Sequence, residues 1–262
     1  MLTLPFFRLF LLIFTLACTP LSFASAPISV NVYLPQNLDK FGKQLPSTSG
    51  GRSVFNYLEQ KSDLKFKFIF LPWKRAQLEV LRGKGILYGF SKSTERLGQY
   101  DYSLPVITLE VWAISTGDPS NQLAEVSDLK GKTIISSLGI SHGIEYELAR
   151  DKVFKVQEDM LPRSEQFKKL LKTPKNIMLL PLRNSQSRSQ VEDLVNNVTI
   201  PDFGRPELNN HHFDISAKPL FHDSIHFASA KDQFSEVLER IDATISKGTK
   251  DGSLTKLLLL YK

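Results

Sequence analysis

Short apolar runs alternate with amphipathic stretches along most of this chain. The apolar runs have the length of strands, whereas the amphipathic stretches repeat apolar residues every three or four positions, as helices do. Strands are predicted at residues 28–33, 64–71, 86–90, 110–115, 133–136, 176–182 and 226–230. Helices are predicted at residues 51–61, 74–82, 141–151, 164–171, 187–196, 233–246 and 253–260. This alternation predicts an α/β fold, and neither a repeat nor a low-complexity tract interrupts it.

The N-terminal segment has the residue order of a secretory signal peptide. Arg8 precedes an apolar stretch, residues 9–18, which is followed by small residues. We predict cleavage after Ala24, because cleavage after Ala26 would leave Pro27 directly behind the scissile bond. An uncleaved membrane anchor is the weaker alternative, since about ten apolar residues fall short of the ~20 needed to span a bilayer.

Removal of residues 1–24 takes away Cys18, the only cysteine of the chain. Disulfides, thiolate metal sites and cysteine nucleophiles are then excluded together. Lipid attachment at Cys18 is an alternative, but Thr15 stands where such a site normally has a leucine-like residue. The remaining ~235 residues suffice for one large domain or two lobes. No later segment approaches membrane-spanning length, so the exported product is expected to be soluble.

The net charge of +6 and the pI near 9.2 raise the question of a nucleic-acid or membrane partner. The basic residues are dispersed, and the densest group alternates with apolar positions in a predicted helix, which is typical of a solvated helix face. This group comprises Lys168, Lys169, Lys172 and Lys175. With no helix-turn-helix or zinc-finger spacing, no nucleic-acid partner is expected.

A polar loop follows the strand at 86–90. It carries Ser91, Ser93, Thr94 and Arg96, after Gly89. Hydroxyl groups and backbone N–H groups beside a guanidinium can fix a carboxylate through two hydrogen bonds. The loop therefore predicts a site for a small carboxylate.

The sequence around this loop strengthens the prediction. P-W-K-R-A at 72–76 precedes it and Y-D-Y-S-L-P at 100–105 follows it. In this order the segment resembles the ligand-binding core of the bacterial extracellular solute-binding proteins of family three, the polar amino-acid type. The resemblance implies a two-lobed, type II periplasmic-binding-protein-like α/β fold, in which two sheets flanked by helices are joined by two crossing strands.

The resemblance also implies how the chain is divided. Residues 109–115 resemble the outward crossing strand, D-L-K-G-K at 128–132 resembles the start of the second lobe, and 223–230 resembles the return. The implied lobe one comprises residues 25–112 and 225–262, and lobe two comprises 113–224.

Site residues follow from the resemblance position by position. The implied ligand contacts are Arg96 on a carboxylate, Ser91 assisting it, Gly89 allowing close approach, Tyr33 and Trp73 as aromatic walls, and Ser141 in the turn S-L-G-I-S-H-G at a helix start. Four of these residues have a simpler alternative. Arg96 would be a surface arginine paired with Glu95 or Asp101, Trp73 a core residue, Tyr33 a strand-end residue and Ser141 a plain helix N-cap. His142 is expected to face solvent.

Departures from the family pattern concern the ligand. The segment 83–85 lacks the acidic residue that the family usually has there, and Arg183 follows the strand at 176–182 where amino-acid binders place an aspartate. Arg183 would repel an ammonium group and favour a second anionic group. The expected ligand is therefore a dicarboxylate or another anion, and loss of amino-acid binding is the alternative.

Catalytic and metal patterns are weak. His222 and His226 have a zinc-like spacing only in a helix, whereas this segment is predicted as a strand, in which they would lie ~13 Å apart. Neither a metal site nor a cofactor is expected. A periplasmic dehydratase or lyase on the same fold is the enzymatic alternative, with Glu95 or Glu110 as its acid.

The sequence thus predicts a monomeric periplasmic binding protein, not an enzyme. It would capture a small, carboxylate-bearing, anionic or amino-acid-like solute in an interlobe cleft. Its membrane partner would be the permease of an ABC-type importer, or a sensor kinase if the protein serves signalling.

Overall fold

The computed structural model describes residues 26–36, 49–116, 123–183 and 186–259. The predicted signal peptide lies outside these ranges. The strands are β1 (Ile28–Pro35), β2 (Leu64–Leu71), β3 (Ile86–Phe90), β4 (Tyr100–Tyr102), β5 (Ile107–Thr116), β6 (Thr133–Ser137), β7 (Lys155–Asp159), β8 (Asn176–Arg183), β9 (Phe213–Ile215) and β10 (Phe221–Ala230). The helices are α2 (Ser49–Ser62), α3 (Trp73–Leu81), α4 (Thr94–Leu97), α5 (Ile144–Ala149), α6 (Arg163–Leu170), α7 (Arg188–Asp193), α8 (Ile200–Asp202), α9 (Pro206–Asn209), α10 (Ser235–Lys250) and α11 (Ser253–Leu259), with a 3-10 turn η2 (Val126–Leu129) and a π-helical turn η3 (Leu194–Thr199).

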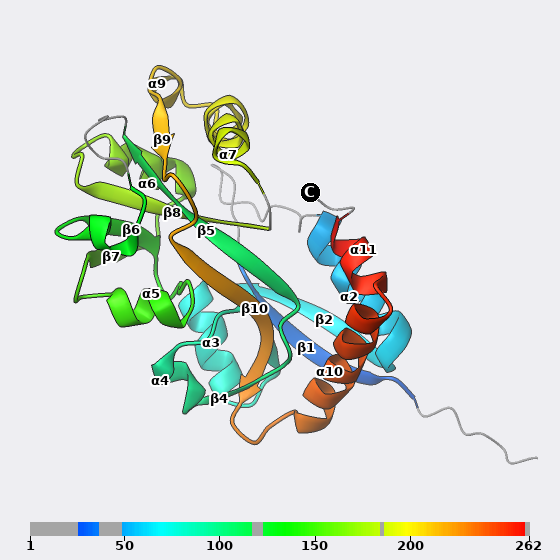
Figure 1. The fold of residues 1–262 in the computed structure, drawn as a ribbon. Coiled ribbons are helices and arrows are strands. Elements are labelled where there is room, and N and C mark those ends of the chain that lie inside the picture. Colours follow the sequence, from blue (N-terminus) through cyan, green and yellow to red (C-terminus); the bar gives the residue numbers. More distant parts are fainter. Residues whose placement is uncertain (1–25, 37–48, 117–122, 184–185, 260–262) are drawn as a thin grey trace, which may run out of the picture.

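Two long strands join the two halves of a curved sheet, whose order is β2-β1-β3-β10-β5-β8-β6-β7 (Figure 1). The second half of β10 pairs with β3 and β4, whereas its first half pairs with β5. β5 in turn pairs with β8 and β9. We call the part built on β1–β4 lobe one and the part built on β6–β9 lobe two. The predicted α/β class with two crossing strands is confirmed, and the residue limits of the two lobes stay a prediction.

The strands and helices follow from the spacing of apolar residues. In β2, Leu64 and Phe66 are buried and the intervening Lys65 is exposed, as the period-2 alternation of a strand requires. In α10, Val237, Ile241 and later residues at helical spacing are buried against lobe one. Burial of each such side chain contributes about 1.5–3 kcal/mol to folding.

Helices cover both faces of the lobe-one sheet. α2, α10 and α11 pack together on one face, and α3 packs on the other (Figure 1). Lobe two has separate apolar clusters around α5 and around α6, α7 and η3. Within the described ranges, no helix combines the length and the apolar character needed to cross a bilayer.

The structure corrects several predicted boundaries. α5 begins at Ile144, because Gly143, with φ +93°, is its N-cap. The prediction of a helix from Ser141 was therefore wrong, and so was the alternative in which Ser141 is its N-cap. β10 begins five residues before the predicted strand, since polar residues 222–224 obscure its pattern. The short strands β4, β7 and β9 were not predicted.

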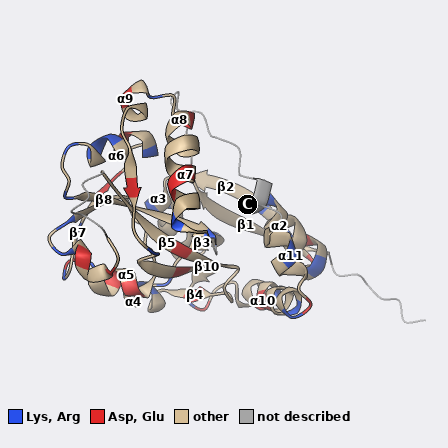
Figure 2. Cartoon of the chain, turned by 45° about the horizontal axis from the view of Figure 1, so that its top comes forward, with Lys and Arg blue, Asp and Glu red and all other residues tan. Residues whose placement is uncertain are grey.

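Charged residues of both signs are distributed over both lobes (Figure 2). In the lysine group around α6, Lys168 lies 2.7 Å from Glu207 and 3.2 Å from Glu165. Lys169 lies 2.6 Å from Asp159. These two members of the densest basic group are therefore paired with carboxylates on their own lobe.

Candidate functional site

Both lobes and a crossing strand meet at one group of polar residues. Ser91 and Arg96 come from the loop and short helix that follow β3, Gly139 and Ser141 from the turn that follows β6, and Asp223 from the start of β10. We call these five residues the interlobe cluster. The parallel strands β3 and β6 each end at this point, which is where open α/β sheets place their ligands.

The hydroxyl group of Ser91 connects the three segments. Its Oγ lies 2.6 Å from Oδ2 of Asp223 and 3.2 Å from the carbonyl oxygen of Ser141. Because a hydroxyl group has one proton, it can donate fully to only one of these acceptors, and the shorter contact is with Asp223. Ser91 is only 4% exposed, so this contact is shielded from water.

The guanidinium of Arg96 also spans the lobes. It donates to the carbonyl oxygen of Ser91 at 3.0 Å and to that of Gly139 at 2.8 Å. It also lies 4.3 Å from the centre of the Phe90 ring, in a cation–π contact. Burial lowers the pKa of Arg96, and the neighbouring Tyr102 and Glu147 oppose this effect. Two of its five N–H groups are used, so the others can still bind an anion.

Asp223 is a buried acid that the sequence interpretation did not select. It is 6% exposed, and its Oδ1 accepts a hydrogen bond from the backbone N–H of Ser224 at 2.7 Å. Burial raises the pKa of its carboxyl group to about 6, although the hydrogen bond from Ser91 and the charge of Arg96 act in the opposite direction. The sequence did contain one signal that could have identified Asp223. It is a carboxylate inside a predicted crossing strand, and such a residue must lie near the boundary of the lobes.

The turn before α5 brings lobe two against this acid. A Cβ atom on Gly143 would lie 3.1 Å from Oδ1 of Asp223 and 3.2 Å from the carbonyl oxygen of His222. Within the described part of the chain, the buried Oγ of Ser141 and the buried hydroxyl of Tyr102 make no hydrogen bond. Buried polar atoms are normally paired, so these two groups are candidates for contact with a ligand or water.

The aromatic residues predicted as cleft walls belong to a core cluster. Tyr33 is 4% exposed and Trp73 is 9% exposed, and both pack in the cluster between α3 and the lobe-one sheet. β1 continues to Pro35, so Tyr33 does not end the strand. This placement favours the core interpretation for both residues, and their contact with a ligand stays a prediction.

Gly89 has the geometry that the prediction requires. Its φ is +88°, which favours glycine, and no atom would lie within 4 Å of an added Cβ. The pairing of β3 with β10 shifts register here, so Leu87 and Phe90 both join the α3-side cluster. Gly89 therefore offers open space beside the backbone just before Ser91.

Arg183 is not joined to the interlobe cluster. It donates to the carbonyl oxygen of Leu258 in α11 at 3.3 Å, and its charge acts on Tyr88. Tyr88 packs on the face of the lobe-one sheet covered by α2, α10 and α11, whereas Phe90 beside Arg96 packs on the other face. A ligand contact of Arg183 stays a prediction, and this position favours a structural role.

The prediction that His142 faces solvent was wrong. Its side chain is buried, with its ring centre 5.1 Å from that of Tyr146. Burial, together with the charge of Arg163, lowers the pKa of His142 to about 3. His142 is therefore neutral at physiological pH.

The other histidines considered for a metal are separated in strand β10, as predicted. His222 is exposed, whereas His226 is buried with Nδ1 2.8 Å from the carbonyl oxygen of Ser103. The two side chains therefore lie in different surroundings.

A cavity of about 430 Å³ opens beside the interlobe cluster on the α3 side. Arg96 and Gly139 line it, together with charged residues of both signs such as Lys74, Glu147 and Arg150. Ser91, Ser141 and Asp223 do not line it. The volume is in the range of small-molecule sites, and Arg96 connects the cavity with the buried acid.

No family model matches the sequence, and no curated protein matches it significantly. Solved structures do match. A mutant of ArgBP from T. maritima superposes with a TM-score of 0.63 at 16% identity, covering 89% of this chain and 94% of that chain. An amino acid ABC transporter substrate-binding protein from Streptococcus pneumoniae, bound to L-arginine, gives 0.60 at 18% identity, with 89% and 93% covered. This is the fold of the two-lobed solute-binding proteins.

A third match is also an amino-acid-binding protein. An ancestral amino-acid-binding protein, described as a precursor of cyclohexadienyl dehydratase, gives a TM-score of 0.61 at 18% identity, with 89% and 95% covered. The resemblance seen in the sequence is thus confirmed at the level of the solute-binding-protein fold. The interlobe cluster lies where the two lobes of this fold meet.

Proposed function

We propose that this chain is a periplasmic solute-binding protein that captures a small carboxylate-bearing solute between its lobes. The observation that carries the proposal is the interlobe cluster, in which a guanidinium, hydroxyl groups and a buried acid from both lobes and a crossing strand converge. Direct contacts between lobes, such as that from Arg96 to Gly139, support closure about the crossing strands. A ligand with contacts to both lobes would stabilise the closed state.

The ligand we propose carries a cationic or donating group as well as a carboxylate. Arg96 would bind the carboxylate through its remaining N–H groups, assisted by the unpaired Oγ of Ser141. Burial disfavours the charged form of Asp223, and a ligand ammonium group would relieve this penalty. Since Arg183 contacts α11, the case for a dicarboxylate is weaker than that for an amino-acid-like zwitterion.

The membrane partner follows from the same proposal. A closed, ligand-bound form would present both lobes together to a permease, and one of the matching structures is a substrate-binding protein of an amino acid ABC transporter. A sensor kinase would use the same closure and remains the alternative partner. The proposed location is the periplasm, after removal of residues 1–24.

The test is a thermal-shift screen of amino acids, their deaminated dicarboxylate counterparts and sugars, followed by calorimetry on the compound that stabilises the protein most. We expect Arg96→Ala to weaken its binding by about 2–5 kcal/mol, because the carboxylate would be buried without its charge partner. Arg75→Ala, on the exposed surface of α3, is the matched control and should bind as the wild type does. Unchanged affinity in Arg96→Ala would show that Arg96 does not bind the carboxylate.

A lyase is a second candidate, and Asp223 is the observation that favours it. An acid with a pKa of about 6 beside a hydroxyl group can hold a proton near neutral pH and donate it to a leaving group. The acids suggested by the sequence are less suited, since Glu95 is exposed and Glu110 lies half-buried on β5. Incubation of each stabilising compound with the protein, followed by mass spectrometry, decides between the two. Conversion that is lost in Asp223→Asn, while binding persists, would establish the lyase.

A further inference from the structure

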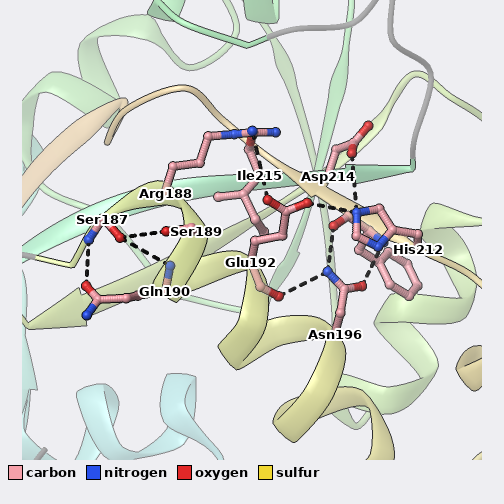
Figure 3. Close-up of polar contacts among 10 residues, drawn as sticks. Ser187, Arg188, Ser189, Gln190, Glu192, Asn196, His212, Asp214 and Ile215 are labelled. Atoms are coloured by element: carbon pink, nitrogen blue, oxygen red, sulfur yellow. Dashed lines mark hydrogen bonds and ion pairs between the residues drawn. The ribbon is translucent and has the colours of Figure 1, made fainter.

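One histidine and two carboxylates come together in lobe two, away from the interlobe cluster (Figure 3). Glu192 belongs to α7, His212 directly precedes β9, and Asp214 lies within β9. Nε2 of His212 lies 2.8 Å from Oε1 of Glu192 and 3.8 Å from Oδ1 of Asp214. One ligand atom from each residue lies within 4.8 Å of the other two.

The backbone holds these side chains in place. His212 and Asp214 are two positions apart at the start of a strand, so their side chains point to the same face. Asn196, one turn after Glu192, accepts a hydrogen bond from the N–H of Phe213 at 2.9 Å and donates to its carbonyl oxygen at 3.0 Å. The amide of Asn196 thus fixes the segment between the two ligands against the helix (Figure 3).

We propose that Glu192, His212 and Asp214 bind a divalent transition-metal ion, with water completing its coordination. Zinc bonds of about 2.0–2.2 Å place neighbouring ligand atoms about 3.4 Å apart. The three atoms need to adjust by about 1 Å to reach this spacing. The side chains of Glu192 and Asp214 are 27% and 29% exposed, and that of His212 is 60% exposed, so an ion can enter from solvent.

The donor set selects the class of metal. An imidazole nitrogen with two carboxylates suits zinc, nickel or copper, whereas calcium and magnesium prefer oxygen ligands alone. Two carboxylates with a neutral imidazole carry a charge of −2, which matches a divalent ion. Arg188 lies 3.9 Å from Oε2 of Glu192 and so faces the oxygen that is turned away from His212.

The experiment is calorimetric titration of zinc chloride into the purified chain without a histidine tag. We expect one equivalent to bind, and His212→Ala and Asp214→Asn each to weaken binding at least tenfold. His211→Ala is the matched control, because His211 is an exposed histidine one position away that is not part of the group. It should bind zinc as the wild type does.

Cobalt(II) binding gives a second, spectroscopic readout, which does not rely on measuring the heat of binding. Its visible absorption should appear with the wild type and His211→Ala and be absent with His212→Ala and with Glu192→Gln. Thermal unfolding in the presence of a chelator verifies that each variant is folded. If His212→Ala or Asp214→Asn fails this check, Glu192→Gln takes its place in the titration. Equal zinc affinity of the His211 and His212 variants, or no stoichiometric binding by the wild type, would refute the site.

Discussion

At Asp223, burial and hydrogen bonding act on the same carboxyl group in opposite directions. The burial effect is larger, since the pKa is raised to about 6 from the ordinary value of 3.8. The native state therefore binds this proton more tightly than the unfolded state. The stability that this group contributes is full below pH 4 and is lost as the pH rises to about 6.

Replacement of Asp223 by asparagine, which does not ionise, should remove the fall in stability between pH 4 and about pH 6. A shift of about two pKa units corresponds to about 3 kcal/mol, so Asp223→Asn should be more stable than the wild type by up to that amount at pH 7.5 and by little at pH 4. Urea unfolding at both pH values measures the difference. Glu236→Gln, at an exposed acid of α10, is the control.

The buried His142 complicates a simple pH titration, because its effect has the opposite sign. Its pKa is lowered to about 3, so the stability that it contributes is lost as the pH falls below its unfolded value of 6.5. This effect is present in both the wild type and Asp223→Asn and cancels in their difference. If the difference in unfolding free energy between Asp223→Asn and the wild type is the same at pH 4 and at pH 7.5, the assignment of a raised pKa to Asp223 is contradicted.

The turn before α5 lies directly against the start of β10. Gly143 and Gly89 both have positive φ, so alanine at either position should cost about 1–3 kcal/mol in backbone strain. Only Gly143 also has close neighbours, at 3.1 Å from Asp223 and 3.2 Å from the His222 backbone.

Gly143→Ala should therefore destabilise the protein more than Gly89→Ala does. The carbonyl oxygen of His222 belongs to the paired strand β10 and cannot move freely, so the added methyl group must displace the turn. Urea unfolding of the two variants at one pH compares the costs directly. Equal costs would mean that the turn relaxes and that Gly143 is required only for its φ.

Closure of the two lobes is a property of the whole molecule. Apart from the crossing strands, the described parts of the two lobes meet where α3 and α4 contact the turn after β6, and where Arg183 at the end of β8 contacts α11. Gln77 of α3 donates to the carbonyl oxygen of Gly139 at 3.0 Å, beside the hydrogen bond from Arg96. A net hydrogen bond is worth about 1 kcal/mol, so its loss should shift the equilibrium between open and closed forms by about fivefold.

Gln77→Ala should therefore open the protein without unfolding it. Small-angle scattering of the ligand-free variant should give a larger radius of gyration than the wild type, and the ligand found by the screen should bind more weakly. Arg75→Ala, at an exposed position on the same helix, should change neither quantity. Identical scattering of the wild type and Gln77→Ala would show that this contact does not hold the lobes together.

Local patterns were enough to predict the α/β class, and the family resemblance supplied the two-lobed arrangement. The alternation in β2 and the helical spacing in α10 are properties of adjacent residues, so these elements were predicted within a few positions. Ser91 and Arg96 were selected because they lie in one contiguous motif. The structure brings them together with Ser141, as the resemblance implied, while their contact with a ligand stays a prediction.

The sequence by itself determined the α/β class and the polar loop of lobe one, because each depends on residues close together in the chain. The two crossing strands were implied only by the family resemblance, since they pair residues more than a hundred positions apart. The tertiary structure alone decided the pairing of Ser91 with Asp223, 132 positions away, the direction of Arg183 towards α11, and the burial of His142. It also decided the meeting of Glu192 with His212. These features depend on how the lobes pack, and packing sets which distant groups lose water and which face each other.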